Sequence, residues 1–180
     1  MNPNLTCIVV AAMLLSACSE RSVEAPHSQN AAAQGAALLE PFKSELMQAL
    51  SAGMQEGPAA AIEVCSREAP EIARKLSVDG VQMGRSSHKL RNPANAPPAW
   101  LAPVLGRYAS GEQSLEPQVV TIDNGRHGYV EPIITRPMCL TCHGSEIDAE
   151  VREQLAADYP MDRATGFEAG DLRGVFWVEF

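Results

Sequence analysis

The chain has 180 residues, of which 46% are hydrophobic, and a formal net charge of -8 at pH 7. Its length suits one domain with a hydrophobic core of its own. The negative charge argues against a nucleic-acid partner, because phosphates require a basic surface, and against attachment to anionic lipid through Lys and Arg.

The N-terminal segment has the pattern of an export signal. Residues 5–17 form an apolar run without a charge, shorter than the roughly 20 residues that span a bilayer. The run ends in LSAC, which resembles the bacterial lipoprotein box. We therefore predict a lipoprotein signal peptide over residues 1–17, a lipid on Cys18 and a periplasmic protein, anchored at the outer membrane because Ser19 is not an inner-membrane retention residue. The alternative is an ordinary secretory signal that contains Cys18, since no Lys or Arg precedes the apolar core.

Residues 18–35 are rich in Ser, Ala, Gln and Asn and lack periodicity, which predicts a flexible tether. A domain over residues 36–180 is expected to follow. Apolar residues at three- and four-residue spacings predict its first helix over residues 38–50, ended by Gly53 and Gly57.

A second helix is predicted from Pro58, a favourable first-turn residue. Its inward stripe repeats at spacings of three and four and consists of Ile62, Cys65, Ala69, Ile72 and Leu76. Pro70 is expected to break or kink this helix, because proline lacks the N–H of a helical hydrogen bond. Cys65 is therefore predicted to point inward near a bend.

The second half of the domain reads as loops and strands. Residues 84–100 are too rich in Pro, Asn and Ser for long elements, although residues 99–108 could form a short helix. Two strand-like runs flank Asn124-Gly125, which predicts a hairpin with a type I′ turn. The final run, GVFWVEF, predicts an interior strand. Helices followed by antiparallel strands indicate an α+β fold, with the helices packed on an antiparallel sheet.

The strongest chemical motif is Cys139-Leu140-Thr141-Cys142-His143, a C-x-x-C-H run typical of covalent haem attachment. Two thiols three positions apart can form thioethers with the two porphyrin vinyl groups, and the adjacent imidazole can bind the iron. Cys139 and Cys142 are thus the predicted attachment sites and His143 the predicted iron ligand. One motif predicts one covalent haem c.

Other uses of these cysteines are less consistent with the sequence. A thioredoxin-like C-x-x-C requires a βαβ pattern, and a structural zinc site requires four ligands, neither of which is found. A disulfide within C-x-x-C would leave His143 unexplained. The predicted mature domain keeps Cys65, Cys139 and Cys142, and three thiols cannot all pair.

The residues alone leave the sixth iron ligand open. Histidines in polar loop sequence are more often solvated, methionines more often pack in a core, and a lone cysteine on an apolar stripe is usually a small hydrophobic residue. Cys65 ranks only slightly above the histidines, on the ground that ferric iron lowers the pKa of a thiol. The candidates are Cys65, His88, His127, Met54, Met83, Met138 and Met161.

Four blocks of the chain, AIEVCSREAPEIA, GRSSHKLRNPANAPPAW, PMCLTCHG and AGDLRGVFWVEF, resemble a bacterial family of single-haem, c-type sensor domains with a PAS-like fold. That family was long catalogued as a domain of unknown function, and the similarity extends from about Ala36 to Phe180. The resemblance implies axial ligation by His and Cys, with His143 as the proximal ligand and Cys65 as the distal one.

The middle block also contains Arg85, Lys89 and Arg91. These cations could neutralise haem propionates or form a solvated basic loop.

Two functions follow from this site. The first is a redox or gas sensor, in which release of Cys65 on reduction would open the iron to CO, NO or O₂. The alternative is a low-potential electron-transfer cytochrome tethered to the membrane by its lipid, whose acidic surface steers it towards a basic partner. We expect no enzymatic activity, because two protein ligands leave no vacant iron position. The expected partners are the membrane, through the lipid, and a redox or signalling protein.

Overall fold

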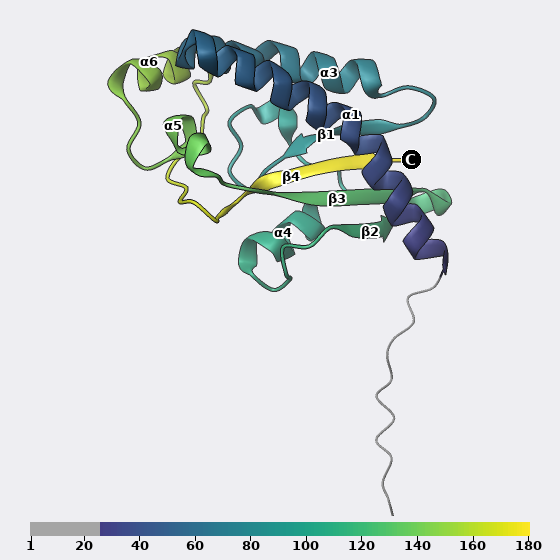
Figure 1. The fold of residues 1–180 in the computed structure, drawn as a ribbon. Coiled ribbons are helices and arrows are strands. Elements are labelled where there is room, and N and C mark those ends of the chain that lie inside the picture. Colours follow the sequence, from purple (N-terminus) through teal and green to yellow (C-terminus); the bar gives the residue numbers. More distant parts are fainter. Residues whose placement is uncertain (1–25) are drawn as a thin grey trace, which may run out of the picture.

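The structure is a computed structural model of the chain and describes residues 26–180 (Figure 1). The predicted signal peptide and the lipidation of Cys18 lie outside the described residues. Within residues 26–180, no helix is long and apolar enough to cross a membrane. The elements are the helices α1 (Pro26–Glu56), α2 (Pro58–Glu63), α3 (Ala69–Leu76), α4 (Ala102–Ser110), α5 (Leu140–His143) and α6 (Ala149–Asp158), and the strands β1 (Gln82–Ser86), β2 (Gln118–Thr121), β3 (His127–Ile134) and β4 (Leu172–Glu179).

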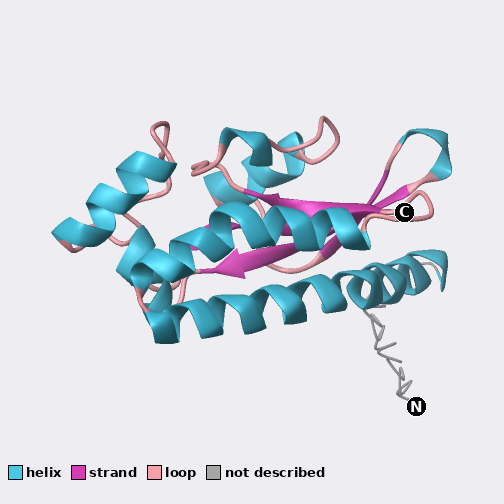
Figure 2. Ribbon diagram, turned by 90° about the horizontal axis from the view of Figure 1, so that it is seen from above, coloured by secondary structure: helices cyan, strands magenta, loops and turns pink. Residues whose placement is uncertain are grey.

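The four strands form one antiparallel sheet in the order β1-β4-β3-β2. The C-terminal strand β4 therefore lies between β1 and β3, which confirms the predicted interior strand. Helices precede most of the strands and pack on the sheet, so the predicted α+β class is also confirmed (Figure 2).

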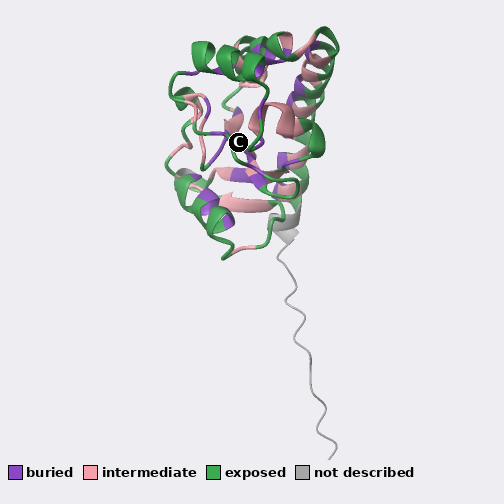
Figure 3. Cartoon of the chain, turned by 90° about the vertical axis from the view of Figure 1, so that its left-hand side faces the viewer, coloured by how far each residue is buried: buried purple, intermediate pink, exposed green. Residues whose placement is uncertain are grey.

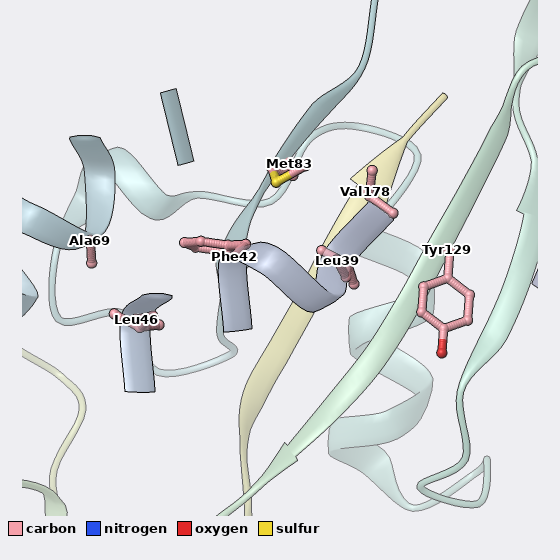
Figure 4. Packing of buried hydrophobic residues seen from close by; sticks show 7 residues of the cluster. All are labelled: Leu39, Phe42, Leu46, Ala69, Met83, Tyr129 and Val178. Carbon is pink, nitrogen blue, oxygen red and sulfur yellow. The ribbon is translucent and has the colours of Figure 1, made fainter. Parts of the chain in front are cut away.

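Alternation along the strands sends side chains to two cores, one on each face of the sheet. Tyr129 and Val178 pack against α1 and α3, whereas their neighbour Val130 packs against α4. Figure 4 shows the first of these cores, in which Phe42 of α1 points towards the sheet. Its buried members are Leu39, Phe42, Leu46, Ala69, Met83, Tyr129 and Val178.

A third cluster fixes the segment that carries the C-x-x-C-H motif. Buried apolar side chains of α6 pack against Ile62 of α2, and Cys142 lies beside them. The buried parts of the chain lie mainly on the sheet and on the inner sides of the helices (Figure 3). The members of this cluster are Ile62, Ile147, Val151, Leu155 and Tyr159.

The first helix starts earlier than the sequence predicts. Helix α1 begins at Pro26, so residues 26–35 of the predicted tether are helical. Ala31 is 4% exposed, and a Cβ at Gly35 would lie 2.3 Å from the Cβ of Tyr129. The small residues that give this segment the composition of a linker instead allow α1 to approach the sheet closely.

Gly53 does not end α1, contrary to the prediction from the sequence. A Cβ there would lie 3.0 Å from the Cα of Ala61, so glycine allows α2 to pack closely against α1. The helix ends before Gly57, whose φ of 123° is unfavourable for other residues.

Three further sequence predictions need adjustment. Strand β1 includes Gly84 and Arg85 from the segment interpreted as loop, because pairing with β4 compensates for the poor strand propensity of these residues. The predicted hairpin of β2 and β3 is present, but a short 3₁₀ turn over Asp123–Gly125 and a bond from Ile122 N–H to Arg126 O close it in place of a two-residue type I′ turn. The short helix α4 starts three residues later than predicted and ends at Ser110.

Replacing Phe42 by Ala tests the core between α1 and the sheet, since Phe42 is 1% exposed. We expect the free energy of unfolding to fall by about 3–5 kcal/mol, because the substitution leaves a cavity. Urea unfolding followed by circular dichroism measures this change. Val78→Ala is the control, because that side chain is 55% exposed and its loss should change the value by under about 0.5 kcal/mol. Equal effects of the two substitutions would contradict this description of the core.

Candidate functional site

A cavity of about 380 Å³ lies between the sheet and the helices α1 and α2. Its sheet wall includes Arg85, Phe176 and Glu131, which are register partners on β1, β4 and β3. The helical wall is largely apolar and includes Leu46, Leu50, Met54 and Ile62. The volume lies in the lower half of the range of small-molecule sites, roughly 300–1,000 Å³.

The C-x-x-C-H motif forms one side of this cavity. A 3₁₀ turn over Pro137–Cys139 leads into α5, and residues three apart on a helical turn share one face. Cys139 and Cys142 accordingly both line the cavity, and both are free thiols. Burial raises the pKa of the Cys142 thiol, so this group is protonated at neutral pH.

His143 lines the same cavity, and one hydrogen bond determines which of its ring nitrogens carries the proton. Its Nδ1 lies 2.7 Å from the carbonyl oxygen of Ala164. A carbonyl can only accept, so Nδ1 carries the proton and Nε2 keeps a free lone pair. Burial, with the nearby charge of Arg173, lowers the pKa of His143 to about 2. The ring is therefore a neutral imidazole whose Nε2 is available as a metal ligand.

Cys65 lies in a π-helical turn, Val64–Glu68, between α2 and α3. The N–H of Ala69 donates to Val64 O, five residues back, and Pro70 has no N–H to donate. The carbonyl of Cys65 thus lacks both its α-helical donor at position 69 and its π-helical donor at position 70. Pro70 accounts for the predicted bend, and the turn gives Cys65 a place on the cavity wall.

The cavity wall carries more positive than negative charge. Arg91 pairs with Asp162, and Lys43 pairs with Glu131. Among residues 26–180, no carboxylate lies within ion-pair distance of Arg85 or Arg173. Desolvation, with Arg91 and Arg85 close by, lowers the pKa of Arg173 to about 10. An anion in the cavity would offset this repulsion.

The structure divides the candidates for the sixth iron ligand into those that line the cavity and those that do not. Met54 and Met138 line the cavity, as does Cys65. The remaining four lie elsewhere: Met83 is in the core, Met161 is 65% exposed, His88 packs on Phe167, and His127 packs on Phe180. Lys89 lies over Phe167 and does not line the cavity, unlike Arg85 and Arg91.

Cys65, Cys139 and Cys142 are all free, so the structure forms no disulfide among them. In the described part of the chain, no three His, Cys, Asp or Glu side chains gather in one cluster of metal-ligating groups.

Three residues of the site carry little or no signal in the sequence. Arg173 lies in the apolar run of β4, where its charge is the only signal. Tyr159 is 6% exposed and lines the cavity, and burial and Cys65 raise its pKa. Ala164 acts through its backbone carbonyl, for which the sequence carries no signal.

Comparison with known proteins places the chain in a family. A family model described as Tll0287-like matches residues 16–180. The crystal structure of the cyanobacterial haem-protein Tll0287 is similar, with a TM-score of 0.53 and 31% sequence identity over 65% of this chain and 71% of that one. A search of curated proteins gave no significant match. The chain belongs to the Tll0287-like family.

Proposed function

We propose that this protein binds one haem covalently through Cys139 and Cys142, with His143 and Cys65 as its iron ligands. One observation carries the proposal: the three free thiols and a neutral imidazole with a free Nε2 line one cavity. Cys65 is more than seventy positions from the motif in the sequence, so a local pattern does not explain this convergence. The similarity to the haem-protein Tll0287 supports the same cofactor.

The walls of the cavity suit the two chemical parts of a haem. A porphyrin ring is apolar, and the helical wall supplies Leu46, Leu50 and Ile62. The propionates are anionic, and Arg85 and Arg173 lack carboxylate partners among the described residues. Of the three cations expected in the middle block, Arg85 is the one with a free charge in the cavity.

A bound haem would supply one-electron redox chemistry and, when an iron position is open, binding of small gases. The protein would contribute the rest. Cys139 and Cys142 hold the group in place, the carbonyl of Ala164 orients His143, and the apolar wall limits water.

We propose redox or gas sensing as the function, on a PAS-like domain, and not catalysis. The π turn supports this assignment, because Cys65 lies on a helix with a missing hydrogen bond whereas His143 is held by Ala164. A site that responds to a change of redox state or to a gas suits one iron ligand that moves more readily than the other. Electron transfer to a basic partner is the second candidate, supported by the net charge of -8.

Export and lipid anchoring belong to the same proposal. The apolar residues 5–17 and the lipoprotein-like box at Cys18 support them. A redox or signalling protein at the membrane would then be the partner, and nucleic acid would not.

Replacing Cys139 and Cys142 together by Ala should abolish covalent haem attachment, because no vinyl thioether can form. Intact mass and haem staining after denaturing electrophoresis measure it on protein made with the haem-attachment machinery. Cys65→Ala is the matched control and should keep its covalent haem. Haem that survives denaturation in the double variant would refute attachment at these positions.

Replacing Cys65 by Ala should remove one axial ligand and leave the covalent haem attached. The oxidised wild-type protein is expected to give a low-spin thiolate signature in optical and EPR spectra, and the variant should lose it. Met54→Ala controls for another residue of the cavity wall. Identical spectra of wild type and Cys65→Ala would reject Cys65 as a ligand. Binding of CO by the reduced wild type favours sensing, and an inert reduced state favours electron transfer.

Replacing Arg173 by Met should weaken haem binding, because an anionic group loses a charged partner. In the background that lacks Cys139 and Cys142, titration with haem should show a Kd about tenfold or more higher, as expected for loss of a charged hydrogen bond. Arg107→Met is the control, because Arg107 lies on α4 and does not line the cavity. A Kd unchanged by Arg173→Met would show that Arg173 does not contact the cofactor.

A further inference from the structure

Arg91 connects the two chain segments that determine the position of His143. Its side chain is 8% exposed, and its Nε donates to Asp162 at 3.0 Å. Its Nη2 donates to the carbonyl of Cys142, the residue before His143, and to that of Ala164 at 3.2 Å. The guanidinium thus joins the helix that carries His143 to the loop that carries the acceptor of its ring.

The carbonyl of Ala164 is shared by two donors. It accepts from Arg91 and from Nδ1 of His143, at 3.2 and 2.7 Å. Asp162 holds the same residue through the preceding peptide group, because its Oδ1 accepts from Ala164 N–H at 2.7 Å while its Oδ2 accepts from Arg91. Arg91 and Asp162 therefore determine where the carbonyl of Ala164 points.

A lysine would not reproduce this arrangement. The guanidinium has five N–H donors in a rigid planar fork, whereas an ammonium group is a compact point charge on a flexible stem. The three acceptors of Arg91 belong to Asp162, Cys142 and Ala164, and they come from segments about twenty residues apart. An ion pair with Asp162 alone would not need the two carbonyl bonds, which both concern His143.

We infer that Arg91 is a positioning residue: by fixing the carbonyl of Ala164 against the backbone of Cys142, it keeps His143 in the Nδ1–H tautomer and leaves Nε2 free for iron. The iron-binding part of this inference rests on the proposed function; the tautomer does not. Arg91 accordingly serves the motif helix, and the propionates are left to Arg85 and Arg173.

The tautomer of His143 is measured by ¹⁵N NMR on the full-length chain made without haem attachment, with His143→Gln to assign the ring signals. The wild type should show the Nδ1–H form. In Arg91→Met the ratio of Nδ1–H to Nε2–H should fall about tenfold, which corresponds to the loss of one ordinary hydrogen bond. Arg91→Lys should shift the ratio in the same direction by less, and it serves as the test if Arg91→Met does not fold.

Val151→Ala is the matched control. Val151 is buried in the cluster beside Cys142, and its aliphatic side chain forms no hydrogen bond. It should lower stability and leave the tautomer ratio unchanged. A wild-type ratio in both Arg91 variants, or an equal shift in Val151→Ala, would overturn the inference. Haem uptake by the wild type is measured on separate samples made with haem attachment. Failure to take up haem would refute the proposed function and would leave the tautomer inference untouched.

Discussion

The structure depends on the burial of strand β4 on both faces. Its side chains alternate between two cores, with Val178 on the side of α1 and Val175 on the side of α4. One helix layer would leave half of these apolar groups in water, so both faces must be covered. The face under α1 is filled by apolar side chains over one part of its length. Towards the Arg173 end of β4, it borders the cavity in which the reactive side chains meet.

Burial also determines the chemistry of this cavity. It raises the pKa of the Cys142 thiol and lowers that of His143, so both groups are neutral before any ligand arrives. The same desolvation acts on Arg173, which stays charged because its pKa of about 10 is still above neutrality. A protein with a net charge of -8 thus keeps a cation that has no carboxylate partner among residues 26–180 in a cavity whose helical wall is largely apolar. That combination suits a ligand with an apolar body and anionic substituents.

The sequence predicted those parts of the site whose signals are local. The C-x-x-C-H motif lies within one helical turn, and the stripe that contains Cys65 repeats at helical spacing. Signals that depend on tertiary contacts were missed. Strand β1 has poor strand propensity and exists because β4 pairs with it. Residues 26–35 are helical, and the small residues Ala31 and Gly35 allow this part of α1 to pack closely. The role of Ala164 belongs to its backbone, which every residue shares, so no pattern of side chains predicts it.

The two proposed iron ligands are held in unequal ways, and this difference bears on function. His143 is fixed through its ring by Ala164 and through its backbone by a bond from Phe167 N–H, 3.0 Å long, to His143 O. Cys65 lies in a π turn, and its carbonyl has no donor five residues on, because that residue is Pro70, which has no N–H. An electron carrier works best when both ligands stay in place in both redox states, because movement of a ligand slows transfer. A site that must respond to a change of redox state or to a gas needs one fixed ligand and one that can leave. The unequal support of His143 and Cys65 is the reason to prefer sensing.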